Sequence, residues 1–334
     1  MEVRTKLKAE EIAISASLAM MLEAAAYPKP GNVHRLKDFE ETYFEHFLAS
    51  SASVQPVFLK IAEKSALKEN EAISFGPYFE EAIRKSQLKQ TGGNTHFGTL
   101  ILLLPIAAAA GKIGENWDGN DLIEKASDIC RKTTFEDAVH FYNAFSRFSI
   151  PVVKKEVASD LKYDLTDAAS IDNIKANKIS LFDLMTLGSE RDMIAMEWVN
   201  GFEKSKLFAK KLQENKIRFE NNPKKCFGTA VNSAIVYTFI EFLARYPDTF
   251  ISTKFNEKEA LKIQKKAAKI IEKKNKTKNK IKNKTKGKKK NLKKMIRKIE
   301  KLDQELQKKK MNPGSIADIA AAGLFISLLE GMKI

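Results

Sequence analysis

The sequence has little cysteine and no long apolar run. Its two cysteines, Cys130 and Cys226, are far apart and show no C-x-x-C spacing, which argues against a disulfide scaffold or a cysteine-based zinc site. The longest apolar stretch, 99–110, contains a proline and is too short to span a bilayer. The N-terminal residues lack the apolar core and cleavage site of a signal peptide. We therefore expect a cytoplasmic protein without a membrane span.

Strand signals are also scarce. Strict alternation of apolar and polar residues appears only in short stretches, of which 150–153 and 216–219 are the best candidates. Spacings of three and four predominate instead, as in a predicted helix over 189–213. Its buried stripe comprises Met193, Ile194, Met196, Val199 and Phe202. The pattern predicts an all-α fold, a single multi-helix globular domain.

The net charge of +16 is confined to one segment. Residues 258–310 contain 24 Lys and Arg against 5 Asp and Glu, a net of +19, so the remaining chain has a net charge of −3. We therefore interpret 257–310 as a lysine-rich insertion and expect 1–256 and 311–334 to form one domain. The centre of the insertion has almost no apolar residues, so we expect it to be disordered or a solvated loop. Its flanks have heptad-like spacing, so the segment is either partly disordered or a helical hairpin.

Three glycine-containing turns share one physical design. They are PKPGNVHR (28–35), TGGNTHFGTL (91–100) and NPGSIADIAAAG (312–323), and the last two run directly into helix-like sequence. A tight turn that opens onto a helix presents free N–H groups and the positive end of the helix dipole, which suit phosphate. Each turn also has a structural interpretation. Ser315 and Asp318 match a capping box, Asn94 or Thr95 fits an N-cap, and 28–31 fits a helix end.

Taken in order, the three turns resemble the signature blocks of the triphosphoribosyl-dephospho-CoA synthase family. Weaker similarity lies between them, at Glu23, at TTFEDA (133–138) and at SERDMIAMEWVNGF (189–202). The resemblance implies an all-α enzyme that joins ATP to 3′-dephospho-CoA and releases adenine. It implies the product 2′-(5″-triphosphoribosyl)-3′-dephospho-CoA, small-molecule nucleotide substrates, and Mg²⁺ as the accompanying ion.

Attack on the ribose C1′ passes through a transition state with oxocarbenium character, so the site needs phosphate ligands, carboxylates and proton donors. The candidate catalytic residues are Glu23, His96 and Asp318. Asp318 and Asp192 are the candidate metal ligands, with Asp137 and Glu197 as further carboxylates. The candidate substrate-binding residues are Lys29, Gly31, His34, Arg35, Gly92, Gly93, Asn94, Thr95, Gly314 and Ser315.

The first block differs from the family pattern, which usually reads PKPGLVD and continues into a Gly-Ala-His-x-Asp-Met element. Here Asn32 and His34 stand in place of Leu and Asp, and 36–47 contains no such His-x-Asp pair. This difference motivates an alternative, another phosphoryl or ribosyl transfer in cofactor biosynthesis. The basic segment motivates a third hypothesis, a nucleic-acid-associated protein, since 258–310 will bind polyanions non-specifically.

Overall fold

The protein is described by a computed structural model that covers residues 2–39, 41–67, 72–147, 163, 169–278 and 285–334. Those residues form fifteen α-helices and one short 3₁₀ helix. Within the same ranges the only strand-like pairing is an isolated bridge between His34 and Lys37. The predicted all-α single domain is confirmed.

The longest described connection between helices, 26–43, contains the first glycine turn. Their bounds in chain order are α1 Glu2–Ala25, α2 Phe44–Leu67, α3 Gly76–Ser86, α4 Phe97–Ile113, α5 Gly119–Arg131, α6 Phe135–Arg147, α7 Ala169–Asn177, α8 Leu181–Gly188, α9 Met193–Val199, α10 Glu203–Glu220, η2 Pro223–Lys225, α11 Ala230–Arg245, α12 Thr249–Lys254, α13 Glu257–Lys278, α14 Thr285–Lys308 and α15 Gly314–Leu329.

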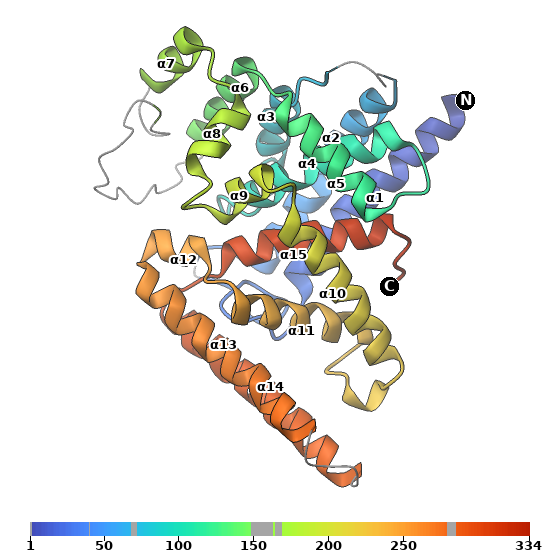
Figure 1. Ribbon diagram of the computed structural model, residues 1–334, viewed down its shortest axis with the longest axis vertical. Coiled ribbons are helices and arrows are strands. Elements are labelled where there is room, and N and C mark those ends of the chain that lie inside the picture. The colour runs from blue at the N-terminus through green and yellow to red at the C-terminus, as the bar shows by residue number, and fades with distance from the viewer. Residues whose placement is uncertain (1, 40, 68–71, 148–162, 164–168, 279–284) are drawn as a thin grey trace.

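Two helices, α4 and α15, lie at the centre of the molecule. Every residue of α4 from Thr99 to Gly111 is buried, and α15 is buried along most of its length. A helix that is apolar on all sides must be covered on all sides. Helices α1 and α2 pack against α4, and α1 also packs against α15. Helix α10 covers another side of α15, with α11 behind it (Figure 1).

The predicted helix over 189–213 is two helices, because the chain turns sharply between α9 and α10. Phe202 has a left-handed φ of 56° and is fully buried. The buried Glu197 carboxylate accepts hydrogen bonds from the backbone N–H groups of Lys204 and Ser205, at 3.0 and 2.7 Å. Glu197 therefore caps the first turn of α10.

The strand predictions fare differently. The prediction at 216–219 is wrong: these residues form the last full turn of α10, where Phe219 is buried in the core while Ile217 is exposed. The alternating pattern arises because these residues lie at the edge of the buried face of the helix. So short an apolar pattern does not distinguish a helix from a strand. Residues 150–153 lie outside the described part of the chain.

The described parts of the lysine-rich segment are helical. Helices α13 and α14 run antiparallel and project from the body (Figure 1). The two helices contact each other, and a set of apolar side chains from both is buried. Its members are Ile263, Ala267, Ile270, Met295, Ile299, Leu302 and Leu306. The central residues 279–284 lie outside the described ranges. Within those ranges, we find no helix with the length and apolarity that a membrane span requires.

The crossing of α4 and α2 should be sensitive to one methyl group. A Cβ on Gly111 would lie 2.3 Å from the Ala62 carbonyl oxygen, whereas a Cβ on Gly188 would meet no atom nearer than 3.5 Å. We expect Gly111→Ala to lower the free energy of unfolding by about 1–3 kcal/mol through overpacking. The control Gly188→Ala should be neutral or stabilising. Urea unfolding followed by circular dichroism measures both, and equal effects would contradict the close crossing.

Candidate active site

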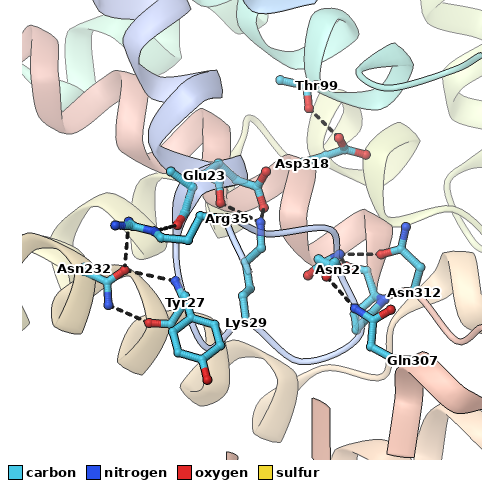
Figure 2. Close-up of polar contacts among 12 residues, drawn as sticks. Glu23, Tyr27, Lys29, Asn32, Arg35, Thr99, Asn232, Gln307, Asn312 and Asp318 are labelled. Atoms are coloured by element: carbon cyan, nitrogen blue, oxygen red, sulfur yellow. Dashed lines mark hydrogen bonds and ion pairs between the residues drawn. The ribbon is translucent and has the colours of Figure 1, made fainter. Parts of the chain in front are cut away.

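The first and third predicted turns are in direct contact. Gly31 has a φ of 78°, and a Cβ there would lie 2.4 Å from the Met311 carbonyl oxygen, so only glycine fits. The next residue, Asn32, donates its side-chain amide to the Asn312 side chain and to the Pro313 carbonyl oxygen, the latter at 3.5 Å (Figure 2). The peptide bond between Tyr27 and Pro28 in this turn is cis.

The second turn meets the same place from the other side. A Cβ on Gly98 would lie 2.1 Å from Asp318 Oδ2, so the backbone of α4 passes directly against this carboxyl group. Thr99 Oγ1 donates a hydrogen bond of 2.5 Å to Asp318 Oδ1 (Figure 2). The starts of the two central helices therefore meet at Asp318.

A buried ion pair lies beside this junction. Lys29 is 1 % exposed, and its ammonium group binds both the Glu23 carboxylate and, at 2.6 Å, the Glu23 carbonyl oxygen (Figure 2). Two of its three N–H donors are thus directed to Glu23, at the end of α1. Burial raises the pKa of Glu23 and lowers that of Lys29, and the attraction between the two opposes both shifts. Asp318 also lies within electrostatic range of Lys29.

Carboxyl groups are concentrated at this junction. Burial, assisted by the charges of Glu23, Asp248 and Asp192, raises the pKa of Asp318 to about 8 against the opposing hydrogen bond from Thr99. Asp318 is therefore mostly protonated at pH 7 when the site holds no cation. Three of the predicted acidic residues, Glu23, Asp192 and Asp318, are brought into electrostatic contact by the fold.

His96 lies deep at the start of α4. It is 3 % exposed, Nδ1 shares a 2.9 Å hydrogen bond with Ser50 Oγ, and the Phe47 ring packs edge-on against it. Burial, together with the nearby charge of Lys29, lowers the pKa of His96 to about 3. His96 is therefore neutral at pH 7, and it can form hydrogen bonds but does not carry a proton to donate as an imidazolium.

Unpaired polar atoms mark the same region. Among the described residues, four buried side-chain oxygen or nitrogen atoms have no hydrogen-bond partner within the protein, and three of them belong to the predicted turns. These are Asn32 Oδ1, Thr95 Oγ1 and His96 Nε2, and the fourth is Ser17 Oγ on α1. Buried polar groups in native proteins are nearly always paired. Such a concentration indicates groups that a bound ligand or ordered water satisfies.

Other predicted substrate-binding residues form hydrogen bonds within the protein. Arg35 is exposed and donates to the Ala25 carbonyl oxygen and, at 3.3 Å, to Asn232 Oδ1 (Figure 2). The Gly92 N–H group donates to Gln90 Oε1 at 2.6 Å. Asn94 Oδ1 accepts from the Phe97 N–H group at 3.0 Å. The N-cap residue of α4 is nevertheless His96, so the interpretation of Asn94 or Thr95 as the N-cap is wrong. The exposed Gly93 has a φ of 73°.

The third turn is fixed by polar contacts to α12. Ser315 does not cap α15, so the capping-box interpretation is wrong: the helix begins after Pro313 without a side-chain cap. The Ser315 hydroxyl instead accepts from the Phe250 N–H group at 3.1 Å and shares a 2.9 Å bond with the Thr249 hydroxyl. Tertiary partners at 249–250, which no local pattern reveals, decide this orientation. Gly314 packs against the Phe250 ring.

Two candidate carboxylates bind backbone N–H groups at the starts of helices. Asp192, which is exposed, accepts from the Ile194 N–H group at 2.9 Å and begins α9. Asp137 binds the N–H groups of Gly76 and Thr134 at 2.7 and 2.8 Å, away from the junction. Asp192 is thus a typical N-cap, whereas Asp137 lies in the first turn of α6.

Sequence reasoning missed Asp248. This buried carboxylate accepts from the Ile251 N–H group at 3.0 Å and from the Ile316 N–H group at 2.9 Å, so it joins the starts of α12 and α15. Burial raises its pKa to about 7. The PDT sequence at 247–249 carries the signal of an N-cap. The bond to α15 depends on a contact across 68 positions and has no local signal.

The arrangement of the acidic side chains limits how the protein could bind a metal ion. Among the described residues, no group of three or more His, Cys, Asp or Glu side chains is arranged to hold a metal ion. The described residues therefore do not provide a complete set of protein ligands for a metal ion. Mg²⁺ commonly needs only one or two carboxylates when substrate phosphates complete its coordination.

Comparison with known proteins places this site in a family. A family model described as CitG, ATP:dephospho-CoA triphosphoribosyl transferase, matches residues 9–334. A crystal structure from Archaeoglobus fulgidus, described as a candidate triphosphoribosyl-dephospho-CoA synthase, is similar with a TM-score of 0.58 and 26 % identity. That similarity covers 86 % of this chain and 100 % of the other. Among curated proteins, no match was found.

The family match includes all three turns, and the fold brings those turns together around Lys29 and Asp318. The chain therefore belongs to the ATP:dephospho-CoA triphosphoribosyl transferase family, whose members transfer the triphosphoribosyl group of ATP.

Proposed function

We propose that this protein transfers the triphosphoribosyl group of ATP to a hydroxyl group of 3′-dephospho-CoA. The bond between ribose C1′ and the adenine nitrogen breaks, and a bond forms between C1′ and the acceptor oxygen. The acceptor hydroxyl loses its proton, adenine leaves with a proton, and the triphosphate remains on the transferred ribose. The observation that carries this proposal is the convergence of the three turns of a matched family at one buried cation.

Lys29 is our candidate ligand for the triphosphate. Its third N–H donor is not used by Glu23, and a buried ammonium attracts phosphate strongly because little water screens it. Glu23 holds the ammonium in place and offsets its charge in the free protein. The N–H groups at the starts of α4 and α15 add further positive potential.

Asp318 is our candidate for proton exchange, because a pKa of about 8 lies near the working pH. In this role it can give a proton to the leaving adenine or, once ionised, stabilise positive charge at C1′. His96 complements it as a neutral hydrogen-bonding group, through the unpaired Nε2 atom. This division of roles differs from the sequence expectation that His96 would itself be the acid.

The residues present fit a Mg²⁺ ion that arrives with ATP. Asp318 and Asp192 would hold it, since the charge of Asp192 is close enough to raise the pKa of Asp318, and phosphate oxygens would supply the remaining ligands. A bound Mg²⁺ would neutralise triphosphate charge. The crowding of acidic groups around Asp318 supports this assignment, because a cation relieves their mutual repulsion.

Two other functions remain candidates. Asn32 and His34 motivate a different phosphoryl or ribosyl transfer from the same nucleotide site. The net charge of +19 over 258–310 motivates polyanion binding by the hairpin. Aromatic residues are absent from the sequence between 257 and 310, which disfavours specific recognition of single strands.

The proposed reaction predicts its own products. Purified protein with ATP, Mg²⁺ and 3′-dephospho-CoA should release adenine, measured by liquid chromatography, with stoichiometric formation of the triphosphoribosylated acceptor. Formation of ADP or pyrophosphate instead would favour the alternative transfer. Failure to bind ATP and to form any of these products would contradict the proposal.

Within that assay, Lys29→Gln should lower kcat/KM for ATP at least about 100-fold, because the triphosphate loses its buried cation. The control Lys60→Gln removes an exposed lysine that pairs with Glu81 and should leave the rate unchanged. The double variant Glu23→Gln/Lys29→Gln leaves no unpaired charge in the core. It should recover thermal stability without recovering activity, which separates the two effects.

The raised pKa of Asp318 predicts a dependence of stability on pH. Between about pH 4 and pH 8 the folded protein holds a proton that the unfolded chain releases, so this residue makes stability fall as pH rises through that window. Asp318→Asn cannot ionise and should raise Tm by a few degrees at pH 8.5, with little change at pH 5. Asp128→Asn, which alters a surface pair with Arg131, is the control. A gain independent of pH would refute this assignment.

The lysine-rich hairpin should bind polyanions independently of ATP. Deletion of 274–290 should abolish binding of labelled RNA and DNA, measured by fluorescence anisotropy, and binding by the intact protein should weaken steeply between about 50 and 200 mM salt. ATP binding by the shortened protein should be unchanged. Loss of ATP binding would mean that the tip of the hairpin also supports the nucleotide site.

A further inference from the structure

The base of the lysine-rich hairpin lies against the first turn of the active site. Asp303, on α14, is 7 % exposed although the helix is otherwise rich in exposed lysine. Its Oδ1 accepts a hydrogen bond of 2.9 Å from the Gly31 N–H group, and its Oδ2 lies 3.1 Å from His34 Nε2. One carboxylate therefore joins both sides of the Pro-Gly turn.

The direction of these bonds requires two acceptor oxygens. His34 Nδ1 accepts from the Leu36 N–H group at 3.3 Å, so Nδ1 carries a lone pair and Nε2 carries the hydrogen. Nε2 consequently donates to Asp303 Oδ2, while Gly31 donates to Oδ1. An amide at position 303 has only one acceptor oxygen, so in either orientation it would set an N–H group against one of the two donors.

Other contacts from α14 fix the same turn. Gln307 Nε2 donates to the Asn32 carbonyl oxygen at 2.8 Å (Figure 2). Leu306 packs against Gly31. The Tyr27 hydroxyl donates to Glu300 at 3.3 Å. These contacts flank position 29 on both sides along the chain. The position of the Lys29 backbone, and so of its ammonium group, is determined in part by α14.

We propose that Asp303 is a positioning residue of the nucleotide site, which holds the 27–34 turn in the shape that presents Lys29 to the triphosphate. The inference rests on the proposed function, in which Lys29 binds ATP. It assigns the base of the hairpin to the active site. Because phosphate binding contributes to both the ground state and the transition state, loss of this positioning raises KM more than it lowers kcat.

The experiment is a double-mutant cycle between positions 303 and 34, with ATP affinity from calorimetry and kcat and KM from adenine release. Asp303→Asn should raise KM and Kd for ATP about tenfold, with kcat within about threefold of wild type. His34→Gln can donate to Asp303 and should raise KM for ATP less than Asp303→Asn does. In the double variant Asp303→Asn/His34→Gln, the oxygen of one new amide accepts from the N–H group of the other, which should restore KM to within about threefold.

Glu305→Gln is the matched control, because Glu305 lies on the same helix and pairs only with surface lysines Lys266 and Lys309 among the described contacts. It should leave KM for ATP within about twofold of the wild-type value. Gln307→Glu, which sets a carboxylate against the Asn32 carbonyl oxygen, tests the same turn without altering Asp303. It should raise KM for ATP about fivefold. If Asp303→Asn does not fold, this variant tests whether α14 positions the turn.

The outcomes separate the hypotheses. A fall in kcat and Tm with unchanged KM means a structural role only, and an unrestored KM in the double variant means that the two residues do not act as a pair; either result overturns the inference. Wild-type protein that binds no ATP overturns the proposed function, and the inference with it. Wild-type protein that binds ATP while all variants bind equally well overturns the inference alone.

Discussion

The meeting of two helix starts at Asp318 is the constraint on which the rest of the site depends. Helices α4 and α15 are buried on nearly all sides, so their orientation is set by the core and not by the ligand. Gly98 allows the Asp318 carboxyl group to lie directly against the α4 backbone. Any side chain at 98 would separate the two helix starts, and with them the second and third turns.

This arrangement concentrates charge in a place that water reaches poorly. Lys29 is the buried cation, and Glu23 and Asp318 are carboxyl groups within its electrostatic range. In the free protein, burial drives both carboxyl pKa values upward, so the structure holds groups in unfavourable ionisation states. Proteins tolerate such groups at sites where a ligand relieves the cost. The unpaired Asn32 and His96 atoms have the same explanation.

The sequence by itself determined the all-α class, the helical flanks of the basic segment and the positions of the three turns. Those features arise from local periodicity and from glycine and proline, which act over a few residues. The sequence failed where partners are distant: the local pattern gave Ser315 a capping role, marked Asp248 only as an N-cap, and did not mark Asp303. The composition of the basic segment does not single out Asp303, because 258–310 contains 24 basic residues and only five acidic ones.

Only the tertiary structure decided which candidates share one place. Arg35 lies close to Lys29 in the sequence, yet it is exposed and binds Asn232, while Lys29 is buried at the junction. The neutral state of His96 and the raised pKa of Asp318 likewise depend on burial and on neighbouring charges. Such properties come from residues separated by up to hundreds of positions. A linear pattern therefore identifies the groups, and three-dimensional packing sets their ionisation and their partners.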